Sequence, residues 1–291
     1  MPLEVIPKSL YLSKKLKPML SDERSSILRK TLTDNLIHTG KYIAMPLVVY
    51  IVQGRQVIRD PDGIDHVIGE GHLIFLPRDV YVVSDYVATP GVFEAFLFFI
   101  DGEVIERYLR SSVPPMVQST DKTASRCGPH SFQANAQISR YIHSLGDVYT
   151  AAENTAALLE LKLQELLHLI AIQDRSFEFI KALSGEASFA KRPITEFMER
   201  YQGHDLKVED YASLSGRSAS TFVRDFKKAY NTTPSQWIID RRVARAHRML
   251  IEQNLSVGDA ALEAGYDSVS HFIKAYRRKF GVTPHQAKGL V

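Results

Sequence analysis

The stretch FIKAYRRKFGVTP, from Phe272 to Pro284, combines a line of aromatic residues, a cluster of cations and a turn signal. Its Phe272, Tyr276 and Phe280 are spaced four residues apart, so in an α-helix they lie on one face. The glycine and the Thr-Pro pair that follow are typical of a helix end and of the start of the next helix. The stretch therefore predicts a basic helix with one aromatic face.

The same arrangement occurs once before in the chain, in different residues. The segment LKVEDYASLSG (206–216) matches LSVGDAALEAG (255–265) at an offset of 49, and the offset is 50 beyond the glycine. The matched pairs include Leu206/Leu255, Val208/Val257, Asp210/Asp259, Ala212/Ala261, Gly216/Gly265, Ser218/Ser268, Phe222/Phe272, Phe226/Tyr276 and Tyr230/Phe280. Such a repeat predicts two copies of one unit, each a short helix, a tight turn with Gly and a second helix opened by Ser.

The second helix of each copy has a predicted core face and a predicted free face. The glycine can adopt the left-handed conformation that ends the first helix, and Ala212 or Ala261 lets the two helices cross closely. The aromatic residues then form the core. Short polar groups and cations share the opposite face: Ser220, Thr221, Arg224, Lys227 and Lys228 in the first copy, and Ser270, His271, Lys274, Arg277 and Arg278 in the second.

A helix with polar groups near its start and cations behind them suits the major groove of DNA. Arg224 and Lys274 are equivalent in the two copies, and we expect them to contact base edges. Lys227, Lys228, Arg277 and Arg278 are expected on phosphates. Between the copies, SQWIIDRRVARAHRMLIEQ (235–253) predicts one long helix, which would place the two reading helices about 10 base pairs apart on successive major-groove segments.

Residues 192–288 resemble the DNA-binding domain of the AraC/XylS family of bacterial transcription regulators. The resemblance rests on ASLSGRSxSxF, on TPSQWIIDRRVARAHRML and above all on AxEAGYxSxSHFIKAYRRKFGVTP, while Tyr211 and Asn231 depart from the commoner residues. It implies a seven-helix domain with two helix-turn-helix units that binds double-stranded promoter DNA. It also implies activation of transcription through contact with RNA polymerase, in the cytoplasm and on the nucleoid.

The N-terminal half resembles the effector and oligomerisation half of such regulators, a cupin-like barrel followed by helices. It is also similar to activators of type III secretion genes, in which the signal can be a protein partner. The implied partner is therefore an effector, either a small molecule or a protein. Target genes, effector identity and the choice between activator and repressor do not follow from the residues.

Length and composition favour two domains of a soluble protein. The chain has 291 residues, 45% of them hydrophobic and 24% charged. From Arg192 onward 16 Lys and Arg stand against 11 Asp and Glu, whereas residues 1–191 have 20 against 22, so the basic character lies in the C-terminal third. No apolar run is long enough to predict a membrane helix or a signal sequence, and Cys127 has no partner for a disulfide.

The predicted fold class is α+β, with an N-terminal barrel and an all-α C-terminal domain. Short runs rich in Val, Ile, Phe and Tyr, separated by PDG, GEG and TPG, predict a barrel over about 40–101. Helical periodicity follows over about 103–172. The expected domains are an effector and oligomerisation domain over 1–181, a linker over 182–191 and a DNA-binding domain over 192–291.

Two features of the N-terminal half allow two interpretations each. The apolar stripe that contains Leu163 and Leu167 is either core packing or the contact of a homodimer. The expected barrel interior is either a packed core or the lining of an effector pocket, and no ligand-binding residue is assigned. The interior residues expected from the alternation are Val49, Ile51, Ile74, Leu76 and Phe98.

Two other functions compete with DNA reading. A cupin metalloenzyme needs an HxH pair, but His66 and His72 are six residues apart and Glu70 and Glu94 are scattered, so no catalytic residue, metal ligand or cofactor is predicted. The motifs of P-loop, dinucleotide-binding, zincin and hydrolase sites do not occur in the chain. An interaction protein that keeps the repeat without reading DNA is the other alternative, and the cations present in both copies argue against it.

Overall fold

The computed structural model describes residues 4–7, 16–22, 24–88, 91–112, 128–149, 156–187, 193–201 and 206–289. The chain divides into two compact units, Met1–Ala190 and Lys191–Val291. Cys127 lies outside the described residues. No helix in the described ranges has both the length and the apolar character needed to cross a membrane.

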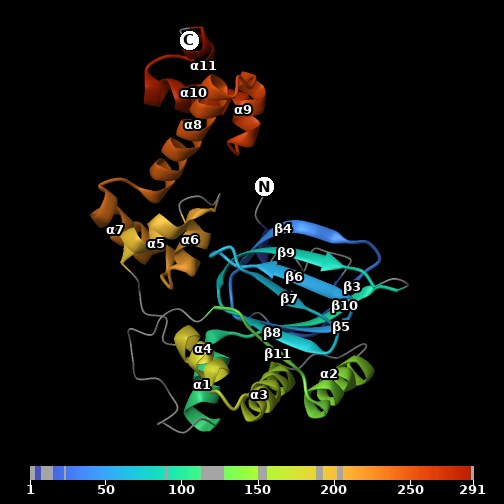
Figure 1. Cartoon of the computed structure of the whole chain (residues 1–291). Coiled ribbons are helices and arrows are strands. Elements are labelled where there is room, and N and C mark those ends of the chain that lie inside the picture. Colours follow the sequence, from blue (N-terminus) through green and yellow to red (C-terminus); the bar gives the residue numbers. More distant parts are fainter. Residues whose placement is uncertain are drawn as a thin grey trace. The chain divides into compact units, whose positions relative to one another are not determined.

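The N-terminal unit contains two facing β-sheets (Figure 1). One sheet has the order β1-β4-β9-β6-β7 and the other the order β11-β8-β5-β10-β3-β2. The strands are β1 (Glu4–Ile6), β2 (Leu16–Ser21), β3 (Ser26–Leu32), β4 (Leu36–Ile43), β5 (Leu47–Gln53), β6 (Arg55–Arg59), β7 (Asp65–Ile68), β8 (His72–Leu76), β9 (Asp79–Tyr86), β10 (Phe93–Phe99) and β11 (His130–Gln133). The sheets begin well before residue 40, where the sequence predicted the barrel to start. The sequence signal is weak there because β1 has only three residues and because β2 (LKPMLS) and β3 (SILRKTL) carry Lys, Arg and Ser among their apolar residues.

The sheet that contains β5, β8 and β10 is buried on both faces. Side chains that alternate along a strand fall into two cores. Val49, Ile51, Ile74 and Leu76 face the other sheet, as the sequence predicted, and they are at most 2% exposed. Phe98 lies in the core on the opposite face, against the helices, so its predicted place inside the barrel is wrong. The run FEAFLFF is apolar at consecutive positions, and its alternation therefore could not show which residues point inward.

Four helices cover the outer face of this sheet (Figure 1). They are α1 (Gly102–Ser112), α2 (Ala136–Val148), α3 (Ala156–Gln173) and α4 (Glu178–Ala187). Leu163 and Leu167 on α3 are 0% exposed and pack in the core shared with the sheet. Core packing, one of the two predicted interpretations, therefore accounts for this stripe, and a dimer contact through these two side chains is wrong because the chain itself covers them.

Helix α4 also changes the expected linker. Residues 182–187 belong to this helix, and Ala182 and Leu183 are buried in the helix-side core. The Ser-Gly pair at 184–185, a common loop signal, is accommodated inside the helix, where the Ser184 hydroxyl donates to the carbonyl oxygen of Ile180 at 2.8 Å. The rest of the predicted linker, residues 188–191, lies outside the described residues.

The described part of the C-terminal unit is helical throughout, with seven helices, the number that the resemblance implies. They are α5 (Ile194–Tyr201), α6 (Val208–Leu214), α7 (Ala219–Tyr230), α8 (Pro234–Glu252), α9 (Val257–Glu263), α10 (Val269–Phe280) and α11 (Pro284–Lys288). The predicted long helix between the copies is α8. Its Thr233 side chain caps the helix start by accepting from the backbone N–H of Gln236, and Pro234 occupies the first turn.

The repeat extends further toward the N-terminus than its sequence shows. Buried residues of α5 match buried residues of the second half of α8 at the same offset of 49, in the pairs Ile194/Val243, Phe197/Ala246 and Tyr201/Leu250. Each copy is therefore a three-helix unit. Copy one consists of α5, α6 and α7, and copy two consists of the second half of α8 with α9 and α10.

Candidate nucleic-acid interface

The turn between the first and second matched helices has the same backbone in both copies. Gly216 and Gly265 have φ angles of 66° and 83°, in the left-handed region that glycine adopts without strain. The N–H of Arg217 donates to the carbonyl oxygen of Ala212 at 2.9 Å, and the N–H of Tyr266 donates to that of Ala261 at 3.0 Å. These equivalent bonds close the C-terminus of α6 and of α9. The predicted role of both glycines is confirmed.

Helices α7 and α10, which the sequence predicts to read DNA and which we call the reading helices, start and stop at matched positions. Ser218 caps α7 by accepting from the N–H of Thr221, whereas the side chain of Ser268 makes no such bond at the start of α10. Asn231 (φ 53°) and Gly281 (φ 76°) end the two helices in left-handed conformation. Asparagine is a common substitute for glycine at this place, because it tolerates the left-handed region better than other residues.

The aromatic face of each reading helix is buried, with one exception. Phe222, Phe226, Phe272 and Tyr276 are 0% exposed, which confirms their prediction as core residues. Phe280 is 37% exposed and stacks on His247 of α8, with ring centroids 4.5 Å apart. Its predicted place in the core is therefore wrong, because Phe280 is the last residue of α10 and lies at the edge of the hydrophobic core.

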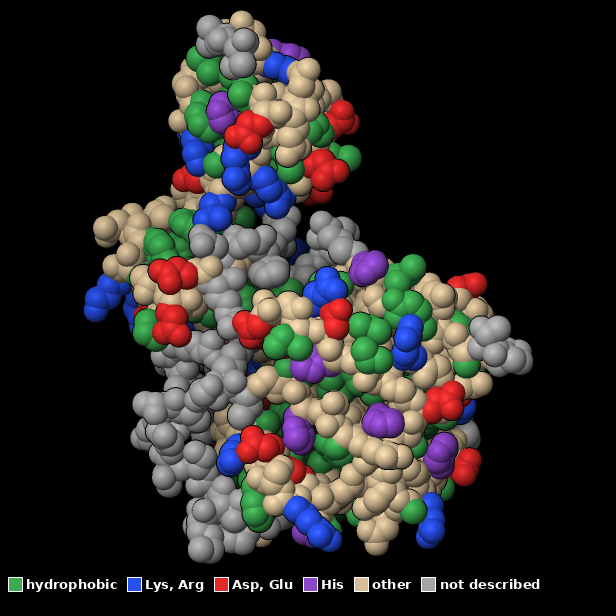
Figure 2. Space-filling model, viewed as in Figure 1, with side chains coloured by type: hydrophobic (Ala, Val, Ile, Leu, Met, Phe, Trp, Pro, Cys, Tyr) green, Lys and Arg blue, Asp and Glu red, His purple; other side chains and the backbone are tan. Residues whose placement is uncertain are grey.

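The opposite face of each reading helix is exposed. Thr221 is half-buried, and its hydroxyl accepts a hydrogen bond from Ser218 at 2.9 Å. The other predicted DNA-binding residues are exposed: Ser220, Arg224, Lys227 and Lys228 on α7, and Ser270, His271, Lys274, Arg277 and Arg278 on α10. Lys and Arg side chains gather on the C-terminal unit near α8 in Figure 2. The sequence pattern therefore brings polar and cationic side chains together on the free faces, as predicted.

The cations of α7 differ in how far they are neutralised within the chain. Arg217 Nε donates a hydrogen bond to Asp225 Oδ2 at 3.1 Å, and this bond lowers the pKa of the Asp225 carboxyl below its usual value. Arg224 also approaches Asp225, at 3.5 Å, while its side chain stays 75% exposed. Lys227 and Lys228 make no side-chain hydrogen bond or ion pair with the part of the chain that the structure describes. They are thus available to phosphates.

The cations of α10 fall into two sets. Within the described residues, the side chains of Lys274 and Arg277 have no hydrogen-bonding or charged partner. Arg278 instead donates to the side-chain oxygen of Gln236 at 3.0 Å, and Lys279 donates to the backbone carbonyl of Asp240. Both acceptors lie on α8. The phosphate contact predicted for Arg278 therefore competes with a contact inside the protein.

Three arginines of α8 support copy two and its junction with copy one. Arg242 donates to the carbonyl oxygen of Gly265 at 3.3 Å, and Arg245 donates to that of Glu263 at 2.9 Å. These bonds satisfy carbonyl groups at the end of α9, where a positive charge is favourable. Arg241 lies over the ring of Trp237, 4.8 Å from its centroid. The sequence pattern did not reveal the roles of Arg245 and Gln236, because their partners are backbone groups or residues distant in sequence.

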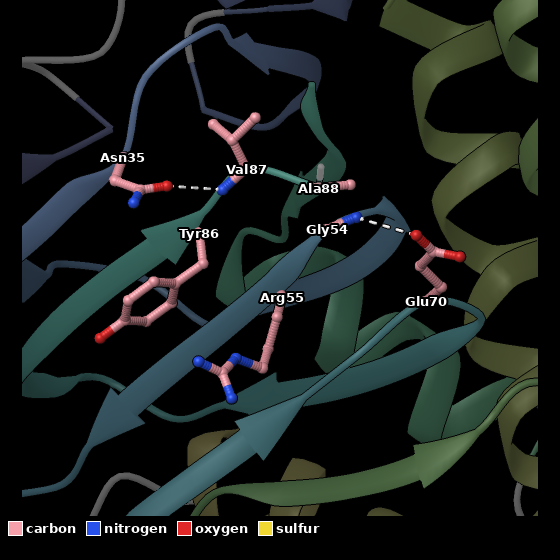
Figure 3. Close-up of a pocket in the computed structure, with 7 residues that line it drawn as sticks. All are labelled: Asn35, Gly54, Arg55, Glu70, Tyr86, Val87 and Ala88. Carbon is pink, nitrogen blue, oxygen red and sulfur yellow. Dashed lines mark hydrogen bonds between the residues drawn. The ribbon is translucent and has the colours of Figure 1, made fainter. Parts of the chain in front are cut away.

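The N-terminal unit has a surface pocket of about 440 Å³ where four inter-strand loops meet (Figure 3). Arg55 lies over the ring of Tyr86, 4.7 Å from its centroid. Glu70 accepts from the N–H of Gly54 at 3.1 Å, and Asn35 accepts from the N–H of Val87 at 2.8 Å. The pocket is lined by Asn35, Gly54, Arg55, Glu70, Tyr86, Val87 and Ala88. Its lining combines polar and apolar groups, and none of the interior residues considered from the sequence lines it.

The histidines considered as metal ligands have other partners. His66 contacts the Asp60 carboxylate at 3.0 Å, and His72 contacts the backbone carbonyl of Glu70 at 3.0 Å. Among the described residues, no three His, Cys, Asp or Glu side chains are grouped so that they could hold a metal ion.

Comparison with known proteins identifies both halves of the chain. Residues 211–289 match a helix-turn-helix domain, and residues 46–182 match the ExsA N-terminal regulatory domain. The virulence regulon transcriptional activator VirF of Yersinia enterocolitica is 26% identical over 249 residues, which cover 82% of this chain and 88% of VirF. The HTH-type transcriptional regulator ExsA of Pseudomonas aeruginosa is 27% identical over 244 residues, 83% of this chain and 85% of ExsA.

A solved structure of apo ToxT from Vibrio cholerae aligns with 93% of this chain and 98% of its own, at 10% identity and a TM-score of 0.46. The two domain matches and the full-length relatives agree with the duplicated unit and with its exposed basic faces. The chain is therefore a DNA-binding transcription regulator of the AraC/XylS family, with an N-terminal regulatory domain of the ExsA type.

Proposed function

We propose that the protein activates transcription by placing α7 and α10 in two successive major-groove segments of a promoter. The observation that carries this proposal is the agreement between the copies: each reading helix buries its aromatic face and exposes equivalent polar and cationic side chains. A helix fixed in this way presents donors to base edges and cations to the flanking phosphates. Arg224 and Lys274, which match in the repeat, are our candidates for base contacts.

The remaining residues of these faces divide by position along the helix. Ser220, Thr221, Ser270 and His271 lie in the first turns, where side chains of a recognition helix approach bases. Lys227, Lys228 and Arg277 lie further along and are assigned to phosphates. Together these residues form the proposed DNA-contact surface of the two copies.

The test replaces the two candidates for base contacts and one candidate for a phosphate contact, and it compares many DNA sequences. A duplex selected in vitro by the full-length protein, and all its single-base variants, are titrated with Arg224→Ala, Lys274→Ala and Lys228→Ala proteins. Loss of a base contact costs about 1–3 kcal/mol of discrimination at one or two positions. Lys228→Ala serves as the matched control and weakens all sequences alike, with the slope of log K against log salt reduced by about 0.9. A uniform loss for Arg224→Ala and Lys274→Ala would assign them to phosphates instead.

The regulatory steps of the proposal draw on the relatives. VirF is named a transcriptional activator, and an activator bound beside a promoter acts by contact with RNA polymerase. We assign no enzymatic activity to the chain, and we place it in the bacterial cytoplasm, where promoter DNA lies. The N-terminal unit is assigned to an effector, and the Arg55–Tyr86 pocket is where a small effector would bind. Mixing the protein with its selected duplex and RNA polymerase, in a transcription assay from a linked promoter, tests activation against repression.

A further inference from the structure

The C-terminal end of α10 is held by side chains of α8. Gln236 accepts a hydrogen bond from Arg278 at 3.0 Å, and its own amide nitrogen donates to the Asp240 carboxylate at 2.8 Å. The next cation of α10, Lys279, donates to the backbone carbonyl of Asp240. Gln236 is therefore oriented from one side by Asp240 and presents its acceptor to Arg278.

The repeat shows what this contact changes. Arg278 is equivalent to Lys228 of copy one, and Lys274 is equivalent to Arg224. Lys274 and Arg278 are four residues apart, so they lie along the same face of α10, next to each other. In copy one the cation at this place, Lys228, has no side-chain partner in the described chain, whereas in copy two Arg278 is occupied.

The difference follows from the length of α8. Helix α5 begins at Ile194, which matches Val243, so the part of α8 that carries Gln236 has no counterpart in α5. Copy one attaches α7 to this same part of α8 through aromatic rings, Phe226 and Tyr230 on Trp237, with centroids 5.7 and 6.2 Å apart. One turn of α8 thus contacts α7 through Trp237 and α10 through Gln236.

We propose that Gln236 is a positioning residue for DNA reading: it withdraws Arg278 from phosphate binding and fixes the end of α10 so that Lys274 meets its base in one orientation. This inference rests on the proposed function of α10. A free Arg278 would add attraction to any DNA, since phosphate contacts carry no sequence information. Holding it on Gln236 lowers non-specific affinity and favours the specific site.

The experiment compares Gln236→Met, Arg278→Gln and the double variant in the full-length chain. Methionine keeps the length of the side chain and removes both hydrogen bonds. Affinity for an in vitro selected duplex, for its single-base variants and for a scrambled duplex of the same length is measured over a range of salt. Ser235→Ala, at an exposed neighbour on α8, is the control for a change in this turn, and thermal unfolding of each variant checks its fold.

Gln236→Met is expected to raise the salt slope on the scrambled duplex by about 0.9, one added phosphate contact. It is expected to lower discrimination by about five- to tenfold in the half-site read by α10, with the other half-site unchanged. The double variant should lose the added slope and keep the loss of discrimination. Arg278→Gln alone should leave the slope unchanged.

Three results would overturn the inference. A slope that falls by about 0.9 in Arg278→Gln would mean that Arg278 binds a phosphate in the native protein. Unchanged slope and discrimination in Gln236→Met would mean that Gln236 positions nothing. Equal loss of affinity on all duplexes with a lowered unfolding temperature would make its role structural. Failure of the proposed function itself looks different, because the native protein would then show no preference between the selected and scrambled duplexes.

Discussion

The two helix-turn-helix copies share a backbone and differ in what surrounds it. Copy one is rich in aromatic rings: Phe222 lies near Phe197 and Tyr211, with centroids 6.3 Å away in both cases. In copy two the residues equivalent to Phe197 and Tyr211 are Ala246 and Ala260, both buried. The same turn can therefore be supported by large rings or by small residues, as long as the glycine and the crossing alanine are kept.

The polar support of the turn differs as well. In copy one Arg217, in the turn itself, donates to the carbonyl oxygen of Ser215 at 3.0 Å and pairs with Asp225. In copy two the support comes from α8, through Arg242 and Arg245. The positions in copy one that match these two arginines are Pro193 and Glu196, which have no positive charge to offer. In each copy a guanidinium group therefore binds carbonyl groups of the turn, but it comes from the turn itself in copy one and from α8 in copy two.

The largest expected effect comes from removing the central ring of each copy. Phe222→Ala and Phe272→Ala each leave a cavity in a fully buried site and should cost about 3–5 kcal/mol of unfolding free energy. We expect Phe222→Ala to cost more, because among the described rings Phe222 pairs with Phe197, Tyr211 and Phe226, whereas Phe272 pairs with Tyr266 and Tyr276. Chemical denaturation of the full-length chain, monitored by hydrogen exchange, measures the unfolding free energy of both variants.

Hydrogen exchange also tests whether the copies are separate units. Phe272→Ala should speed exchange in α9 and α10 more than in α7, and Phe222→Ala should do the reverse. Val269→Ala, at a side chain that is 43% exposed, is the control and should change little. Equal acceleration in both copies would show that Trp237 and α8 make them one cooperative unit, and the comparison between them would then hold for structure and not for stability.

A smaller effect is expected at the turn glycines. Gly216→Ala and Gly265→Ala place a side chain in the left-handed region and should each cost about 1–2 kcal/mol. Gly258 has an ordinary helical place in α9, with only the Ser256 hydroxyl within 4 Å of an added Cβ, so Gly258→Ala should instead stabilise copy two by about 0.5–1 kcal/mol. Thermal unfolding measures all three. Similar losses at Gly258 and Gly265 would mean that crowding, not the φ angle, determines the cost.

The C-terminal fold was predictable because its information is local and given twice. The turn glycines, the crossing alanines and the spacing of Phe222 and Phe272 fix each copy, and agreement between copies removes accidental patterns. The free faces followed once the core faces were known. The contact of Arg278 with Gln236 could not be predicted, because it joins residues 42 apart and its geometry depends on how α10 packs on α8.

The N-terminal half was predictable only in class. Runs such as FEAFLFF are buried on both faces, so their alternation does not assign Phe98 to either core. The stripe on α3 satisfied two interpretations equally, since a helix covered by its own domain and one covered by a second copy need the same residues. The strands before residue 40 carry a weak signal: β1 has three residues and pairs with the distant β4, and the neighbouring strands β2 and β3 carry Lys, Arg and Ser among their apolar residues.

The smallest expected effect separates the copies by pH. Because the hydrogen bond from Arg217 lowers the pKa of Asp225 in the folded chain, the pair stabilises copy one above the unfolded-state pKa of about 3.9 and loses this contribution as the pH falls through the lower, folded-state value. The residue equivalent to Asp225 in copy two is Ala275, which does not titrate. Between about pH 6 and about pH 3, the native chain should lose protection from hydrogen exchange in α7 more than Asp225→Asn does, with α10 alike in both proteins. An identical pH profile of α7 in the two proteins would mean that the ionisation of Asp225 contributes nothing to the stability of copy one.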